Sequence, residues 1–238
     1  MSKKEKDKIM LTEHVLEVRH EASGKFLDVR GVIADFIRNE NFLPHWKIDT
    51  NVVNFRDQSD KIAREGAFVG YKNAGYVVLN PATHNFFTDR AKAFWKLLLK
   101  LKNEGYQLPS LTRFGMRTKI FAPSLSRSFE EINKIMYEEL FSEKARSLVG
   151  GSETDLSFNI NLKESGFNVH VTGGPIHKEE AGQYFQFSDD YFKKCGLYLD
   201  LDYYKDTNLT PDSIPKLLHD AVELMWNKAE NIAGGLGL

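Results

Sequence analysis

The chain has 238 residues, of which 42% are hydrophobic and 27% are charged, and its formal net charge is −1. These values are typical of a soluble globular protein with a sizeable core, and the near-zero charge gives no overall electrostatic case for nucleic acid or an anionic membrane. A single cysteine, Cys195, excludes an internal disulfide framework and fits a reducing, cytoplasmic location. No apolar run approaches the roughly 20 residues of a membrane helix, so we expect no membrane association.

The first part of the chain reads as a strand, a helix, three strands and a second helix. Residues 1–10 are basic and are expected to form a flexible tail, and the first half-unit is assigned to 11–105. Asn103–Pro109 is the best candidate for a linker. Hydrophobic periodicity predicts the elements themselves at Glu13–Glu21, Phe26–Arg38, Trp46–Arg56, Ala67–Tyr71, Tyr76–Leu79 and Thr83–Leu101.

The second part, 106–238, repeats the same order of elements. It opens on Leu111–Phe121, where apolar residues alternate with Arg113, Gly115, Arg117 and Lys119 as in a strand with one buried face. A polar insertion rich in aromatic residues is assigned to Gly173–Lys194. The remaining predicted elements are a helix at Phe129–Phe141 capped by Ser128, a hairpin of Leu156–Leu162 and Phe167–Thr172, a strand at Leu197–Tyr203 and a helix at Thr210–Ile232.

This order predicts an α+β fold in which a strand-helix-three-strand-helix unit is duplicated. Helices would cover one face of antiparallel sheets, and the two half-units would form a saddle-like pseudo-twofold arrangement or one continuous domain. Residue identities do not repeat between the halves, so the internal duplication rests on pattern alone.

The sheet face opposite the helices is the candidate binding surface. In the first half it presents Glu13, Glu17 and Arg19, together with Lys47, Asp49 and Asn51. In the second half we assign ligand or partner binding to the polar positions that alternate with apolar ones, namely Arg113, Arg117, Lys119, Asn159, Asn161, His170, Tyr198, Asp200 and Asp202. The alternative is that these are only the solvated sides of half-buried strands, with Arg117 paired to Asp200 or Asp202.

Two segments carry a resemblance to a known family. TRFGMRTKIFAP in mid-chain and GLYLDLDYYKD before the last helix resemble the best-marked strands of an uncharacterised, sporadically distributed bacterial family of about 250 residues. The chain departs from that pattern at Phe114 and Met116 and in its long insertion. The positions that match are Arg113, Gly115, Arg117, Asp200, Asp202 and Tyr203. The resemblance implies the architecture and no established reaction, and the family's patchy occurrence is similar to that of genes in mobile-element or antiviral-defence operons.

Motifs for catalysis are missing from the sequence. There is no phosphate-binding glycine loop, dinucleotide fingerprint, zinc-protease helix or nucleophile elbow, so no cofactor and no metal are predicted. Cys195 follows two lysines that would lower its pKa, but no base stands beside it in sequence. Asp200 and Asp202 share one face of a strand and are a candidate cation site, although pairing with Arg117 is the stronger expectation. The insertion is either a partner-binding element or a loop that packs its own aromatic residues.

These observations favour a non-enzymatic binding or adaptor protein that holds a protein partner, a second copy of itself or a polar ligand on the open sheet face. Two alternatives stay open. One is a nucleic-acid or nucleotide binder that uses Arg113, Arg117 and Lys119. The other is a metal-dependent hydrolase or nuclease centred on Asp200 and Asp202.

Overall fold

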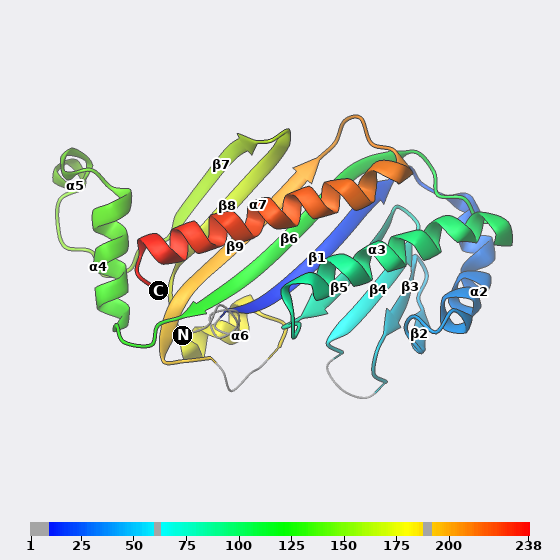
Figure 1. The fold of residues 1–238 in the computed structure, drawn as a ribbon, viewed down its shortest axis with the longest axis horizontal. Helices are drawn as coiled ribbons and strands as arrows, with labels where there is room; N and C mark the ends of the chain where they lie inside the picture. The colour runs from blue at the N-terminus through cyan, green and yellow to red at the C-terminus, as the bar shows by residue number, and fades with distance from the viewer. Residues whose placement is uncertain (1–9, 60–62, 188–191) are drawn as a thin grey trace.

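The computed structural model describes residues 10–59, 63–187 and 192–238, which form one nine-stranded antiparallel sheet with helices packed on it (Figure 1). The basic tail, apart from Met10, lies outside these residues. The strand order is β2-β3-β4-β5-β1-β6-β9-β8-β7. The bounds are β1 Leu11–His20, β2 His45–Ile48, β3 Val52–Arg56, β4 Glu65–Gly70, β5 Asn73–Leu79, β6 Leu111–Pro123, β7 Phe158–Glu164, β8 Phe167–His177 and β9 Cys195–Lys205.

Two long helices, α3 (His84–Lys100) and α7 (Ile214–Gly235), lie across one face of the sheet (Figure 1). The flanking helices are α2 (Gly24–Asn39) and α4 (Phe129–Leu140), and the short helices are α5 (Glu143–Val149) and α6 (Ala181–Tyr184). Ser128 caps α4 through a capping box with Glu131, as its position before the apolar run predicts. Among the described residues, no helix has both the length and the apolar content to cross a membrane.

The core lies between the sheet and these helices because the strands alternate. On β6, Phe114, Met116, Thr118 and Ile120 are fully buried, as the sequence pattern predicts. The α+β class with antiparallel strands is therefore confirmed.

The two parts of the chain meet at the centre of the sheet, where β1 pairs with β6 and Leu16 lies opposite Met116. Outward from this pair, the first part contributes β5, β4 and β3, and the second contributes β9, β8 and β7. This matching order fits a duplicated unit, but the duplication itself stays a prediction.

The structure corrects two predicted boundaries, one predicted strand count and one predicted arrangement. Trp46–Arg56 is not one strand, because the chain turns at 49–51 and forms the β2–β3 hairpin. The first part therefore has four strands after α2 rather than three. The insertion begins at Lys178 rather than Gly173, because β8 continues to His177. The predicted plural sheets are one continuous sheet. The hairpin at Ser165–Gly166 is confirmed, and both turn residues have the positive φ of such turns.

A second, smaller cluster of apolar residues covers one end of the face that carries no long helix. Phe185, Phe187 and Phe192 from the insertion pack there against Phe121 and Tyr198 of the sheet. The insertion thus packs its described aromatic residues onto the sheet, while Tyr191 lies outside the described residues. The rest of this face, called the open face below, is where the polar sides of the strands are found.

Candidate binding site on the open sheet face

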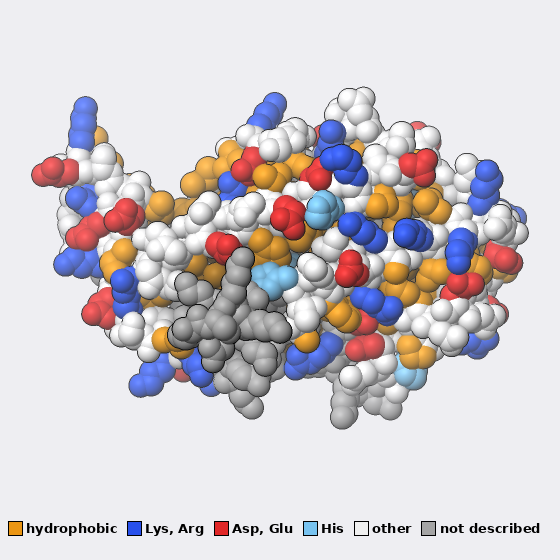
Figure 2. All heavy atoms as spheres, in the orientation of Figure 1, with side chains coloured by type: hydrophobic (Ala, Val, Ile, Leu, Met, Phe, Trp, Pro, Cys, Tyr) orange, Lys and Arg blue, Asp and Glu red, His pale blue; other side chains and the backbone are white. Residues whose placement is uncertain are grey.

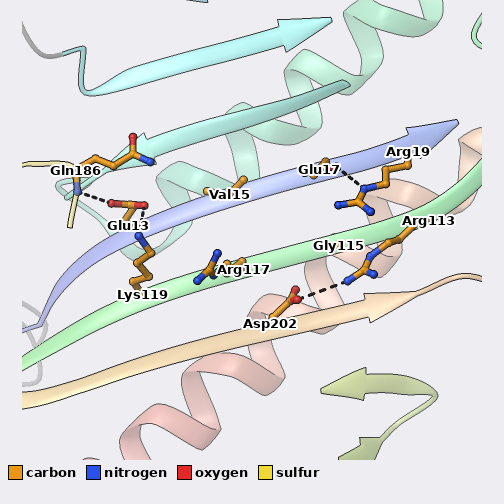
Figure 3. Close-up of a pocket in the computed structure, with 10 residues that line it drawn as sticks. All are labelled: Glu13, Val15, Glu17, Arg19, Arg113, Gly115, Arg117, Lys119, Gln186 and Asp202. Carbon is orange, nitrogen blue, oxygen red and sulfur yellow. Dashed lines mark hydrogen bonds and ion pairs between the residues drawn. The ribbon is translucent and has the colours of Figure 1, made fainter. Parts of the chain in front are cut away.

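A cavity of about 240 Å³ lies at the centre of the open face, over the β1–β6 pair (Figure 3). The two parts of the chain build it together, and the insertion adds Gln186 to its wall. Its lining residues are Glu13, Val15, Glu17 and Arg19 from β1, Arg113, Gly115, Arg117 and Lys119 from β6, and Asp202 from β9.

The floor of the cavity follows from the alternation of β6. One side of the strand carries Arg113, Gly115, Arg117 and Lys119. Gly115 contributes no side chain between the two arginines. A Cβ atom at Gly115 would only reach ordinary contact, 3.6 Å from the carbonyl oxygen of Glu17. The space between Arg113 and Arg117 is therefore open.

Arg117 is held by Asp200. Its Nε donates to Oδ1 at 2.9 Å and its Nη2 donates to Oδ2 at 2.5 Å, which is the bidentate geometry of a strong charge-assisted pair. The Tyr198 hydroxyl donates to the same Oδ2 at 3.2 Å. These bonds raise the pKa of Arg117 further above its usual range, and burial raises the pKa of Tyr198. Of the two predicted partners for Arg117, the structure therefore selects Asp200, whose residue is only 7% exposed.

Arg113 is held more loosely. Its Nη2 lies 3.6 Å from Oδ2 of Asp202, beyond hydrogen-bond distance, and its Cζ lies 4.1 Å from the centre of the Tyr204 ring. Burial raises the pKa of Asp202, and the nearby arginines oppose this shift. The guanidinium is thus positioned by stacking on Tyr204 and keeps N–H groups that are directed at the cavity (Figure 3).

Lys119 closes the other end of the cavity through contacts with the first half and the insertion. Its Nζ lies 3.1 Å from Oε1 of Glu13 and donates to the carbonyl oxygen of Tyr184 at 2.7 Å. The other oxygen of Glu13 accepts from the backbone N–H of Gln186 at 2.9 Å. Glu13 and Lys119 therefore anchor the insertion over this end of the sheet.

Arg19 enters the cavity from β1 and was not among the assigned binding residues, although the sequence placed it on the open face. It lies directly opposite Arg113 in the β1–β6 register, beside a β-bulge at Arg19–His20. Its Nε donates to Oε1 of Glu17 at 2.6 Å. Only the strand order brings Arg19 and Arg113 together, because they are almost a hundred residues apart in the chain.

Five of the nine assigned residues do not line the cavity. Tyr198 and Asp200 hold Arg117 from beside it, and Asn159, Asn161 and His170 lie on the outer strands. Nδ1 of His170 lies 2.8 Å from Oδ1 of Asn161, within hydrogen-bond distance. His170 is also the register partner of Asp202. These side chains extend a polar row from the cavity to the β7 edge of the sheet.

The other candidate chemistries have little geometric basis in the described residues. No three His, Cys, Asp or Glu side chains gather there as a metal site would require. Burial raises the pKa of Cys195, so the expected lowering by its two neighbouring lysines is wrong. The Cys195 thiol is buried and its Sγ lies 3.4 Å from the carbonyl oxygen of Arg127.

The fold and the cavity together define a class, an α+β protein with a charged, open sheet face at the junction of two similar halves. In comparisons with known proteins, no family model, no curated protein and no solved structure matches this chain.

Proposed function

We propose that this protein is a non-enzymatic binding or adaptor protein that holds an acidic segment of a protein partner in the cavity of the open face. The role of the cavity would be to accept one carboxylate of that segment between Arg19 and Arg113. Neighbouring polar groups along the β6 and β9 strands would contact the rest of the segment.

The observation that carries this proposal is that Arg19 on β1 lies directly opposite Arg113 on β6. Like charges directly opposite each other in an antiparallel pair are destabilising, and each arginine has only a partial anionic partner. Glu17 accepts from the Nε of Arg19, and Asp202 lies 3.6 Å from the Nη2 of Arg113. A carboxylate between the two guanidinium groups would relieve their repulsion and receive the planar, two-pronged hydrogen bonding that arginine provides.

The charges around the cavity favour an acidic peptide over a polyphosphate. Four cationic and three anionic described side chains line it, so a long run of negative charge would meet the carboxylates of Glu13, Glu17 and Asp202. A single carboxylate can lie between Arg19 and Arg113 without approaching these three acidic groups. Catalysis is not part of the proposal because each acidic group of the cavity already lies beside a cation: Glu13 beside Lys119, Glu17 beside Arg19 and Asp202 beside Arg113.

The test is a titration of a fluorescently labelled peptide that carries one glutamate among neutral serine and glycine residues, called the single-glutamate peptide below, into the full chain at low salt, followed by fluorescence anisotropy. We expect Arg113→Gln and Arg19→Gln to weaken binding at least tenfold, about 1.4 kcal/mol. Arg38→Gln is the matched control, because Arg38 lies on α2 and pairs with Asp35. Equal losses in all three variants would reduce the binding to nonspecific charge attraction and would overturn the proposal.

Two competitors distinguish the alternatives. If inorganic phosphate or a single-stranded oligonucleotide displaces the peptide and binds more tightly, with the same dependence on Arg113, the nucleic-acid or nucleotide alternative replaces our proposal. Mass spectrometry of protein and nucleic acid that copurify with the chain would then identify the natural partner.

A further inference from the structure

An apolar groove of about 470 Å³ lies on the helix side of the sheet, between α4, α7 and the outer strands β7 and β8. In Figure 2, α4 and α5 project from the body of the molecule, and hydrophobic side chains show in the hollow beside them. The groove is separate from the cavity of the open face. Apolar residues that line it include Met136, Leu140, Phe158, Ile160, Leu224 and Ile232.

The first half shows what such a groove looks like when it is filled. Following the register outward from the Leu16–Met116 pair gives two matching rows: Tyr76, Ala67, Phe55 and Trp46 in the first half, and Tyr203, Val169 and Leu162 in the second. By the same register, Val53 on β3 matches Ile160 on β7. Val53 is completely buried, whereas Ile160 is 44% exposed.

One continuous segment contributes to this difference, together with α2, which contacts β3. After α2, Phe42 packs against Tyr76 and Phe94, with ring centroids 6.2 and 5.7 Å away. Arg90 of α3 covers the ring, with Cζ 4.1 Å from its centre, and Nη2 donates to the Phe42 carbonyl oxygen at 3.0 Å. The chain then continues through Leu43 and forms β2 on the outer edge of β3. The same segment thus fills the core and covers the edge strand.

The second half lacks such a segment among the described residues. After α4 the chain forms α5, where Leu148 and Val149 are strongly exposed, and no described strand lies outside β7. The outer backbone groups of β7 are therefore free to pair with another strand. The groove also has charged groups at its side, where Lys228 is paired with Glu164 at 3.1 Å and Glu139 has no ion-pair partner in the described part of the chain.

We propose that β7 and this groove bind an extended segment of a partner protein, with an aromatic and an aliphatic residue followed by a short strand that carries a basic residue. The aromatic side chain enters the groove as Phe42 enters the first-half core. The strand pairs antiparallel with β7 as β2 pairs with β3, which gives main-chain affinity with side-chain specificity. The basic residue lies on the side of that strand away from the groove, as Lys47 lies opposite Asn54 of β3.

The probe is a fluorescein-labelled peptide with the sequence of residues 41–49, NFLPHWKID, titrated into the full chain. We expect saturable binding that Ile160→Glu weakens at least tenfold, because its carboxylate would enter the apolar groove near Glu139. Lys163→Glu is the control on the opposite side of the same strand. It places a carboxylate on the side of the peptide's His45 and Lys47, so it should not weaken binding. A peptide with Phe and Leu replaced by Ser should bind at least tenfold more weakly.

Hydrogen exchange gives an independent readout, because peptide addition should slow exchange of the β7 amides and leave those of β3 unchanged. The proposal is overturned if the peptide does not bind, or if Ile160→Glu and Lys163→Glu weaken it equally. It is also overturned if sedimentation shows a concentration-dependent dimer that Ile160→Glu dissociates while the peptide has no effect, since a second copy would then occupy the groove. Binding of the single-glutamate peptide should be unchanged in Ile160→Glu, so failure here is separable from failure of the proposed function.

Discussion

The two halves of the sheet have the same strand order outward from β1 and β6, but their outer strands have different surroundings. The first half closes its core with its own chain, because Phe42 enters beneath α3 and β2 covers β3. The second half extends α4 and α5 away from the body and leaves an apolar groove beside β7. The same strand order therefore gives a closed core in one half and an open apolar groove in the other, depending on where a short connecting segment goes.

The largest expected effect concerns the segment that closes the first half. Phe42→Ala should lower the free energy of unfolding by about 3–5 kcal/mol, because it leaves a cavity among Tyr76, Phe94 and Arg90. Urea denaturation followed by tryptophan fluorescence measures the change. Leu140→Ala, beside the second-half groove and 47% exposed, should cost at most about 1 kcal/mol. Equal losses would mean that the second half is closed as tightly as the first.

The next largest expected effect is a pH dependence of the free energy of unfolding that arises in the first half. His14 lies two residues before Leu16 on β1, as Phe114 lies two residues before Met116 on β6, so the two positions are equivalent in the two halves. Burial, together with the neighbouring His84, lowers the pKa of His14 from 6.5 to about 3. The ring stacks on Phe87, with centroids 4.8 Å apart, and Nδ1 lies 2.9 Å from Oγ1 of Thr118. The folded state therefore keeps His14 neutral at pH values where the unfolded chain binds a proton.

The direction of the pH effect on stability follows from this difference in protonation between the folded and unfolded states. Between pH 6.5 and 3 the unfolded state binds more protons, so stability is fully present above pH 6.5 and falls as the pH decreases. The loss from His14 between pH 7 and pH 5 should be about 2 kcal/mol. His14→Phe, which copies the second half, should remove that part of the pH dependence in denaturation curves measured at both pH values. An unchanged pH dependence would show that His14 is not its source.

Much of the fold follows from local patterns. The alternation of β6, the turn at Ser165–Gly166 and the cap at Ser128 depend on residues within a few positions of one another, so the sequence predicts them. The β2–β3 turn was missed because it contains no glycine or proline. It is formed by Asp49, Thr50 and Asn51, and Asn54 Nδ2 donates to Oδ2 of Asp49 at 3.2 Å.

The site was less predictable than the fold, for a physical reason. The sequence identifies which side chains share a face of one strand, but it does not say which strands are neighbours. The pairing of Arg19 with Arg113 depends on β1 lying beside β6. The choice of Asp200 over Asp202 for Arg117 depends on side-chain reach across β6 and β9, since the backbone register places Asp202 directly opposite Arg117.

A smaller effect is expected at Arg117, whose ion-pair partner Asp200 lies in the same half of the sheet. Arg117→Lys should lower the free energy of unfolding by at most about 1 kcal/mol, because the side chain is 52% exposed and solvent screens its pair with Asp200. If Arg117 only supports the scaffold, binding of the single-glutamate peptide stays the same while the melting temperature falls slightly. A tenfold weaker affinity with an unchanged melting temperature would instead place Arg117 in direct contact with the ligand, because lysine cannot reproduce its bidentate geometry.

The smallest expected effect is the response to divalent cations, which tests the hydrolase alternative. Millimolar Mn²⁺ or Mg²⁺ should leave the melting temperature unchanged, because both oxygens of Asp200 accept hydrogen bonds from Arg117 and Oδ2 also accepts one from Tyr198. Burial raises the pKa of Asp202, which disfavours the charged form that a hard cation needs. A metal-dependent rise in melting temperature that Asp200→Asn abolishes would contradict this expectation. It would mean that the cation displaces Arg117 from Asp200, and Asp200 with Asp202 would then have to be considered as a catalytic centre rather than as a support for the arginines of a binding cavity.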